Sequence, residues 1–250
     1  PLAVALALPQ LALAADDKTT TLPEVTVSAS KAESLPLGAS QVDKAGMDRM
    51  KAATSDTASL LRDMPGVSLY GAGGVSSLPV IDGMADDRLR IKVDGMDLIS
   101  ACGNHMNPPL SYIDPSNVES IQVYSGIAPV SVGGDSIGGA IVVKSADPEF
   151  AAAGQGMLLK GQAGAFYRSN GNATGGNLSA TIANEKLSMT YSGSTVESDN
   201  YTAGGNFKTA TYINDRGDRA IAGDEVGSSM YKSTNQSIKF ALRHENHLFE

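Results

Sequence analysis

The chain has 250 residues, of which 42% are hydrophobic and 18% are charged, and it contains one cysteine and no tryptophan. These proportions are ordinary for a folded protein. The formal net charge of −8 argues against a nucleic-acid-binding protein, because proteins of that class carry a basic patch.

Residues 1–14 read PLAVALALPQLALA, an apolar run that ends in small residues. The pattern Ala12-Leu13-Ala14 is typical of a signal-peptide cleavage site, so we interpret residues 1–14 as a truncated signal peptide and expect the protein to be exported. A transmembrane helix is the alternative. It needs about 20 apolar residues, whereas this run is shorter and is interrupted by Pro9 and Gln10.

Residues 15–40 are rich in threonine, serine, alanine and proline. Such small polar residues bury too little area to offset the entropy of ordering, so a mobile arm is predicted here. One apolar patch interrupts the arm, and its alternation Val25-Thr26-Val27 suits a short strand. This strand could extend the sheet of a partner protein or pair within its own domain, and the local sequence leaves both possibilities open.

Residues 41–148 combine short helix and strand signals, which predicts a small α+β domain. A helix is expected at residues 55–64, where cap candidates stand in front and Pro65-Gly66 follows. A second short helix is expected to begin with Asp114 as its N-cap and Pro115 in its first turn. Strands are expected at residues 67–70, 79–81, 89–93, 118–124 and 139–145.

The most distinctive stretch of this domain holds Cys102, His105 and Met106 within five residues. A thiolate, an imidazole and a thioether together favour a soft metal ion, above all Cu(I). Gly103 and Asn104 between them permit the tight turn that would bring the three donors together. The alternative is that the cysteine and the methionine are buried core side chains. In an exported protein, an unpaired thiol is a liability unless it is used or buried.

Residues 149–250 contain segments of about ten residues in which apolar and polar side chains alternate. The clearest are residues 157–167, 176–182, 187–194 and 238–242. In an exported chain this alternation predicts transmembrane β-barrel strands, with apolar side chains toward lipid and polar ones toward the lumen. A soluble β-sandwich has the same period with its apolar face inward, and it is the alternative. Because so few strands cannot close a barrel, we expect only the first strands of one here.

Four segments in the same order along the chain resemble motifs of the TonB-dependent outer-membrane receptors. Residues 23–27 resemble the TonB box, residues 63–67 and 89–96 resemble the first two plug motifs, and residues 118–143 resemble the plug signature. The resemblance implies an α+β plug domain at residues 41–148 inside a transmembrane antiparallel β-barrel that begins at residues 149–250.

The same resemblance implies a partner, a location and an activity. The arm would bind TonB, which is energised by its inner-membrane complex, through Pro23, Glu24, Val25, Thr26 and Val27. The barrel would lie in outer-membrane lipid of a Gram-negative bacterium, with plug and arm facing the periplasm. Transport makes or breaks no bond in the cargo, so we expect a receptor for a scarce nutrient and not an enzyme.

Within that family, Cys102-x-x-x-Met106 followed by Asn107-Pro108-Pro109 is similar to the copper-receptor subgroup, in which a plug cysteine and methionine bind copper. The resemblance implies copper as cargo and Cys102 and Met106 as ligands. His105 is added from ligand chemistry alone. Two alternatives stay open, namely a receptor for a siderophore or other metal chelate, and an exported β-domain without transport.

Other possible ligands are interpreted differently. Met84 and Met96 are expected to pack in the core, because methionine readily fills gaps there. His244 and His247 are not predicted to share a metal ion, because residues three apart on one continuous strand point to opposite faces.

Overall fold

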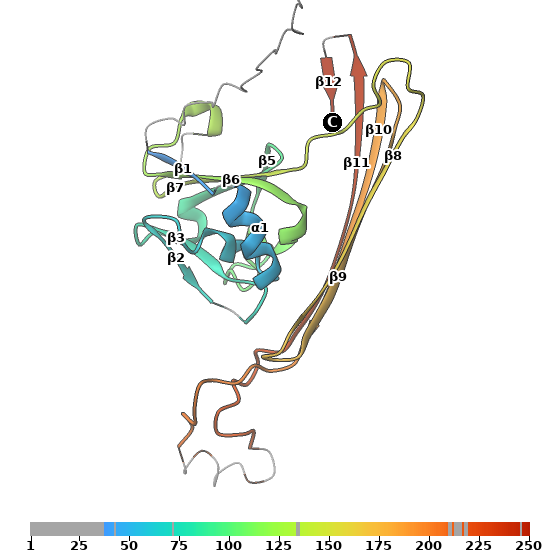
Figure 1. Ribbon diagram of the computed structural model, residues 1–250. Coiled ribbons are helices and arrows are strands. Elements are labelled where there is room, and N and C mark those ends of the chain that lie inside the picture. The colour runs from blue at the N-terminus through green and yellow to red at the C-terminus, as the bar shows by residue number, and fades with distance from the viewer. Residues whose placement is uncertain are drawn as a thin grey trace, which may run out of the picture. The chain divides into compact units, whose positions relative to one another are not determined.

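The computed structural model describes residues 38–42, 44–71, 73–133, 136–209, 212, 217, 220–245 and 247–250 (Figure 1). The proposed signal peptide and the TonB-box residues lie outside the described residues. None of the helices in the described parts of the chain is long and apolar enough to cross a membrane.

The first folded part is a mixed sheet with short helices, as expected for an α+β domain. Its strands are β1 (Ala39–Gln41), β4 (Leu89–Val93), β5 (Met96–Leu98), β6 (Val118–Ser125) and β7 (Gly139–Ser145). They are arranged in the order β1-β6-β7-β4-β5, and β4 and β7 are parallel whereas the other neighbours are antiparallel. A separate hairpin pairs β2 (Val67–Tyr70) with β3 (Leu78–Ile81).

The helices differ from the sequence prediction. The α-helix α1 (Lys44–Ala53) was not expected, and the segment predicted as an α-helix forms the 3-10 helix η1 (Thr57–Leu61). Further 3-10 turns are η2 (Asp86–Arg88), η3 (Pro109–Tyr112), η4 (Pro115–Asn117) and η5 (Val130–Val132). The predicted cap of η4 is confirmed, since the Asp114 carboxylate accepts a hydrogen bond from the Ser116 N–H at 2.9 Å.

The larger of two apolar clusters among the described residues forms the main core of this domain. It forms where the helices cover the sheet, and its most deeply buried side chains include Met47, Leu60, Leu61, Ile81, Leu110, Ile121 and Ile141. Because Leu110 lies in η3, the segment directly after the Cys102 loop is anchored in this core. The C-terminal end of the loop is therefore held in a fixed position.

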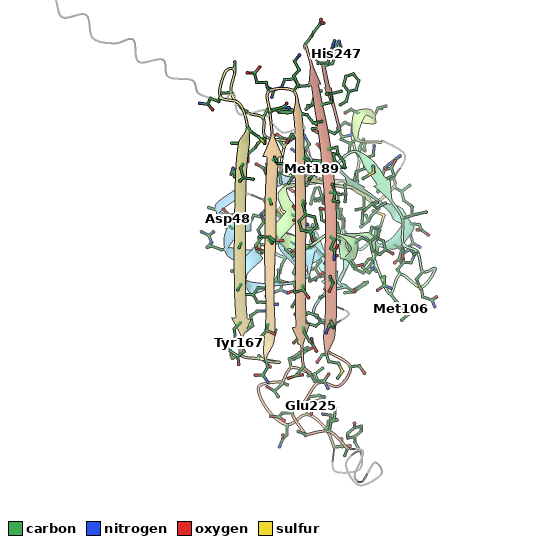
Figure 2. All side chains as sticks on the ribbon, turned by 90° about the vertical axis from the view of Figure 1, so that its right-hand side faces the viewer. Asp48, Met106, Tyr167, Met189, Glu225 and His247 are labelled. Atoms are coloured by element: carbon green, nitrogen blue, oxygen red, sulfur yellow. The ribbon has the colours of Figure 1, made fainter. Side chains whose placement is uncertain are left out.

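The second folded part is an antiparallel meander of long strands (Figures 1 and 2). It comprises β8 (Leu158–Arg168), β9 (Ala173–Ala183), β10 (Leu187–Ser198), β11 (Tyr231–His244) and β12 (His247–Phe249), in sequential order. The register aligns the predicted apolar side chains on one face, since Met189 stands opposite both Ile182 and Phe240.

This apolar face is exposed. Leu178, Leu187, Met189, Ile238, Phe240 and Leu242 all keep large parts of their side chains uncovered. A β-sandwich would bury such a face against a second sheet, whereas a barrel presents it to lipid. The exposure therefore favours the predicted barrel strands over the sandwich.

The turn between β11 and β12 corrects one prediction. His244 is the last residue of β11, His247 is the first of β12, and the two stand directly opposite each other. The expectation that they point to opposite faces is wrong, because the chain reverses between them and does not continue as one strand.

Candidate metal-binding site

The loop that carries the soft donors connects β5 to η3. Its centre is a tight turn in which the His105 N–H donates to the Cys102 carbonyl at 2.9 Å. The predicted turn over Gly103 and Asn104 is thus confirmed. The left-handed residue, however, is His105, with a φ of +51°. Histidine is among the residues enriched in that region, although the conformation is uncommon for any side chain.

Two side chains tie the base of this loop together. The Tyr112 hydroxyl accepts from the Ala101 N–H at 3.1 Å and donates to the Asn107 carbonyl at 3.2 Å. The Ser100 hydroxyl accepts from the Cys102 N–H at 3.3 Å and lies 2.9 Å from the Cys102 carbonyl and 3.0 Å from the Asn107 carbonyl. Both clamps connect the entry of the loop to its exit, so the segment between them is held in one shape.

The two sulfur side chains are accessible within this loop. Cys102 is a free, partly exposed thiol, and Met106 exposes 66% of its surface at the rim of the domain (Figure 2). Neither residue is a buried core side chain, so the alternative of core packing is excluded for both. Their accessibility leaves a thiol and a thioether four residues apart on one loop.

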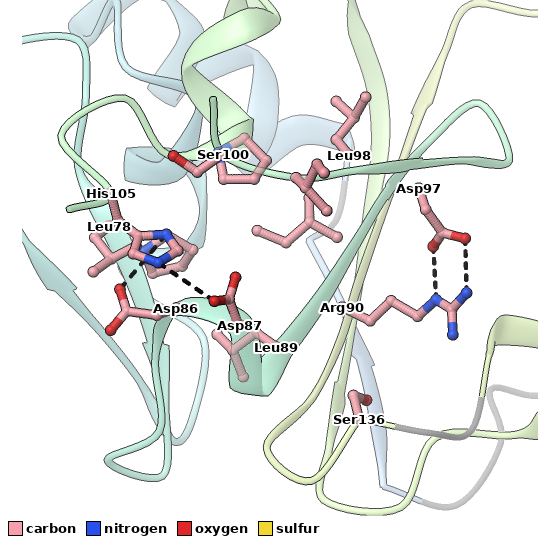
Figure 3. Close-up of a pocket in the computed structure, with 14 residues that line it drawn as sticks. Leu78, Asp86, Asp87, Leu89, Arg90, Asp97, Leu98, Ser100, His105 and Ser136 are labelled. Atoms are coloured by element: carbon pink, nitrogen blue, oxygen red, sulfur yellow. Dashed lines mark hydrogen bonds and ion pairs between the residues drawn. The ribbon is translucent and has the colours of Figure 1, made fainter. Parts of the chain in front are cut away.

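His105 turns toward a different set of groups (Figure 3). Its side chain is only 14% exposed, its Nδ1 lies 3.9 Å from an Asp86 oxygen, and its Nε2 lies 3.8 Å from an Asp87 oxygen. These contacts become ion pairs when the imidazole is protonated. Within the described ranges, no three His, Cys, Asp or Glu side chains are placed to hold one metal ion.

The His105 ring also lines a cavity of about 320 Å³ beneath the loop. Across this cavity Arg90 and Asp97 form a two-pronged pair, with nitrogen–oxygen distances of 2.6 and 2.7 Å (Figure 3). The hydrogen bond from Arg90 holds the pKa of the Asp97 carboxyl below its usual value of 3.8. Cys102 and Met106 do not line the cavity. In this conformation the imidazole of His105 therefore faces the cavity, and the two sulfur side chains lie outside it.

Met84 and Met96 had been expected in the core. Met84 is partly buried, in keeping with that expectation. Met96 is 62% exposed, so the expectation is wrong for it. The reason is its position directly after the Asp94-Gly95 turn at the tip of the β4–β5 hairpin, where no other element covers it.

Sequence reasoning did not find the residues that position the site. Ser100 and Tyr112 act through contacts within the loop, but a serine and a tyrosine at those spacings carry no recognisable pattern. Asp86 and Asp87 lie 18 or more residues before His105 and reach it only through the fold.

Comparison with known proteins identifies the architecture. The family model of the TonB-dependent Receptor Plug Domain matches residues 31–140, a range that includes strands β1 to β6, the first two residues of β7 and the Cys102 loop. Residues 31–140 are therefore a plug domain of the kind found in TonB-dependent receptors. No curated protein sequence matches it. The predicted fold, a plug followed by the first strands of a barrel, is confirmed.

Solved structures of this receptor family resemble the chain in fold. The copper transporter OprC is 25% identical, with a TM-score of 0.67 and coverage of 84% of this chain and 29% of that one. The FrpB iron transporter from Neisseria meningitidis is 19% identical, with a TM-score of 0.62 and coverage of 84% and 30%. The Serratia marcescens hemophore receptor HasR is 17% identical, with a TM-score of 0.61 and the same coverage.

The chain therefore spans about 30% of the length of these receptors. The structures are named as transporters and receptors and not as enzymes, which agrees with the expectation that the chain performs no covalent chemistry. Their cargoes differ, so the likeness in fold does not select one.

Proposed function

We propose that the chain is the plug and first barrel strands of an outer-membrane receptor that binds copper and imports it with the help of TonB. The observation that carries the proposal is the pair of accessible sulfur side chains, Cys102 and Met106, on a clamped loop. The similarity to a structure named as a copper transporter supports the same cargo.

The chemistry of the pair favours Cu(I). Thiolate and thioether are soft ligands that select copper in its reduced state, whereas iron chelates are held by polar and aromatic contacts in a pocket. The clamps at Ser100 and Tyr112 hold the loop before the ion arrives, so less ordering entropy opposes binding. Copper itself is the cargo. The receptor transports it without a covalent reaction.

His105 is the third proposed ligand, and its ring lies beside Asp86 and Asp87 in this structure. To join the sulfur atoms on one ion, its ring has to leave Asp86 and Asp87. Binding of copper by all three donors would therefore couple the metal to a movement at the edge of the cavity. If the ring stays with the aspartates, Cys102 and Met106 bind the ion with donors supplied from elsewhere in the receptor.

Energy for release would come from TonB acting on the arm at Pro23 to Val27. These residues lie outside the described part of the chain, and the proposal for them rests on the resemblance of their sequence to the TonB box. Pulling on the arm would deform the plug and loosen the loop. The barrel would lie in the outer membrane with the arm toward the periplasm.

A receptor for an iron chelate or haem is the second candidate, because FrpB and HasR share the fold. The charges around the cavity beneath the loop disfavour this second candidate. It is lined by Asp86, Asp87 and Asp97, and its arginine is already paired with Asp97. An anionic chelate would meet repulsion there.

The decisive experiment measures Cu(I) affinity in the full-length receptor by competition with a chromophoric chelator under reducing conditions. Cys102→Ser and Met106→Leu are each expected to weaken binding by at least about tenfold, because each removes one donor from a chelate. Met96→Leu is the matched control, since Met96 is as exposed as Met106 but lies at the far end of β5. Equal affinity in the parent and both site variants would refute the proposed ligands.

Transport is tested separately by copper accumulation in copper-limited cells. Val25→Pro removes a backbone donor from the proposed TonB-binding strand and is expected to abolish uptake while leaving Cu(I) binding intact. Thr19→Pro, in the same arm but outside the alternation, is the control. Full uptake by the Val25→Pro variant would contradict the role of the arm, and absence of copper uptake by the parent would refute copper as the cargo.

A further inference from the structure

The hairpin that ends the described sheet places two histidines side by side. His244 closes β11 and His247 opens β12, and the register pairs them directly. Between them, Glu245 adopts a left-handed φ of +52°, as the tight hairpin turn requires. His247 lies at the end of the sheet (Figure 2). The pairing of β11 with β12 thus fixes the positions of the two histidines relative to each other.

Directly opposed residues of neighbouring strands project from the same face of a sheet. Their Cβ atoms are about 4.5–5.5 Å apart, which is within reach of two imidazole rings that bind one ion. With metal–nitrogen bonds of about 2.0–2.1 Å, two adjacent ligand nitrogens lie about 3 Å from each other. Ordinary rotamers of a directly opposed pair bring imidazole nitrogens to this separation.

The surroundings leave both rings available. Toward the described residues, neither imidazole makes a hydrogen bond or an ion pair, and His247 only contacts the ring of Phe249 at a centroid distance of 6.3 Å. The next pair on the same face is apolar, with Leu242 opposite Phe249. The neighbouring cation Arg243 projects from the other face and lies over the ring of Phe150 at 4.0 Å. Repulsion from a fixed positive charge is therefore small at this pair.

We infer that His244 and His247 form a chelating site for a divalent transition-metal ion, with Cu²⁺ as the ion that binds most tightly. Neutral imidazoles suit copper, nickel and zinc, and among these ions Cu²⁺ stands highest in the order of affinities. Two cis nitrogens and water molecules satisfy the tetragonal geometry that Cu²⁺ prefers. The site takes the oxidised ion, whereas the sulfur pair of the loop selects the reduced one, so the two sites are chemically distinct.

The experiment uses the full-length receptor in detergent, titrated with Cu²⁺ buffered by glycine and followed by electron paramagnetic resonance with detection of remote imidazole nitrogens. The expected result is one bound Cu²⁺ with two equatorial imidazoles. His244→Ala and His247→Ala are each expected to remove this signal and to raise the dissociation constant at least about tenfold, because a chelating second ligand binds at high effective concentration.

A composition-matched variant tests the geometry. The double substitution His247→Leu with Leu248→His keeps every residue type but moves the imidazole to the opposite face, since Leu248 pairs with Arg243. It is expected to lose the two-imidazole signal, whereas His105→Ala is expected to keep it. Retention of the signal in the double variant or in both alanine variants would overturn the site.

This inference is independent of the proposed copper import. A Cys102→Ser, Met106→Leu receptor is expected to retain the Cu²⁺ signal with both imidazoles. Loss of Cu(I) affinity together with an intact Cu²⁺ signal would support both sites. Absence of the two-imidazole signal from the parent receptor would overturn the histidine site and leave the sulfur site standing.

Discussion

The hydroxyl of Tyr112 offers a sharp test of whether the Cys102 loop is organised before it binds an ion. It bridges the Ala101 N–H and the Asn107 carbonyl at 3.1 and 3.2 Å, which ties the entry of the loop to its exit. Tyr112→Phe removes both hydrogen bonds and keeps the ring. The change therefore alters the order of the loop without touching any proposed ligand.

The magnitude follows from the two bonds. A neutral hydrogen bond contributes about 0.5–1.5 kcal/mol net, and exposed bonds such as these lie at the lower end. Together they stabilise the closed loop by about 1 kcal/mol, which is roughly a fivefold change in its equilibrium constant. Since apparent affinity falls with the fraction of binding-competent loop, the dissociation constant for Cu(I) is expected to rise about two- to fivefold.

Two measurements check this result in the full-length receptor. Competition with a chelator gives the Cu(I) affinity, and hydrogen exchange read by mass spectrometry reports the opening of residues 99–107. Tyr70→Phe serves as the control, because Tyr70 is exposed and its hydroxyl makes no hydrogen bond to the described residues. Faster exchange in the loop with unchanged Cu(I) affinity would refute the argument that the closed loop is the binding form.

Three further predictions concern the framework of the plug. Ser100→Ala removes the second clamp and is expected to speed amide exchange in the loop, read by mass spectrometry, while β7 exchanges at its parent rate. Gly139→Ala is expected to destabilise the plug by more than about 2 kcal/mol in denaturant unfolding, because its φ is +119° and a Cβ would meet the Tyr124 carbonyl oxygen at 2.1 Å. Gly83→Ala, at φ +82° in open space, costs only about 1 kcal/mol. Arg90→Gln is expected to raise the pKa of Asp97 toward its usual value, seen by NMR of labelled aspartate carboxyls. Because the pKa of Asp97 is lower in the folded than in the unfolded protein, the pair stabilises the fold above the unfolded pKa, and this stabilisation is lost as the pH falls toward the folded pKa. An unchanged Asp97 pKa in the variant would contradict the assigned cause.

The strands were predictable because local signals and tertiary structure agree there. The predicted bounds of β2, β4 and β7 match the structure, since β-branched residues alternate or cluster between clear turn residues. The long strands β9 and β10 were recognised through their strict period of two, although the predicted segments were shorter than the observed strands. The three-residue strands β1, β5 and β12 were missed, because so short a segment holds no period.

The helices were harder to predict. α1 consists mostly of good helix formers (Ala, Met, Lys and Arg), but Gly46 interrupts it and its ten residues carry no regular apolar period, so the segment was missed. Packing of Met47 into the core stabilises the helix. The predicted helix after Ser55 had Asp56 among its cap candidates. The Asp56 carboxylate instead accepts hydrogen bonds from the Ser59 hydroxyl and the Ser77 N–H, the latter from a distant segment. This tertiary contact accompanies a tight 3-10 turn where an α-helix was expected.

The histidines show why donor spacing in a sequence does not define a metal site. At His105 the left-handed backbone and two aspartates from η2 direct the ring into the cavity, although it is a neighbour of Met106. At His244 and His247 the antiparallel pairing of β11 with β12 brings together side chains that a continuous strand would separate. In both cases the direction of the side chain depends on φ angles and on pairing partners that the local pattern does not contain. A metal titration that distinguishes imidazole from sulfur ligands therefore tests the fold of each segment as well as its chemistry.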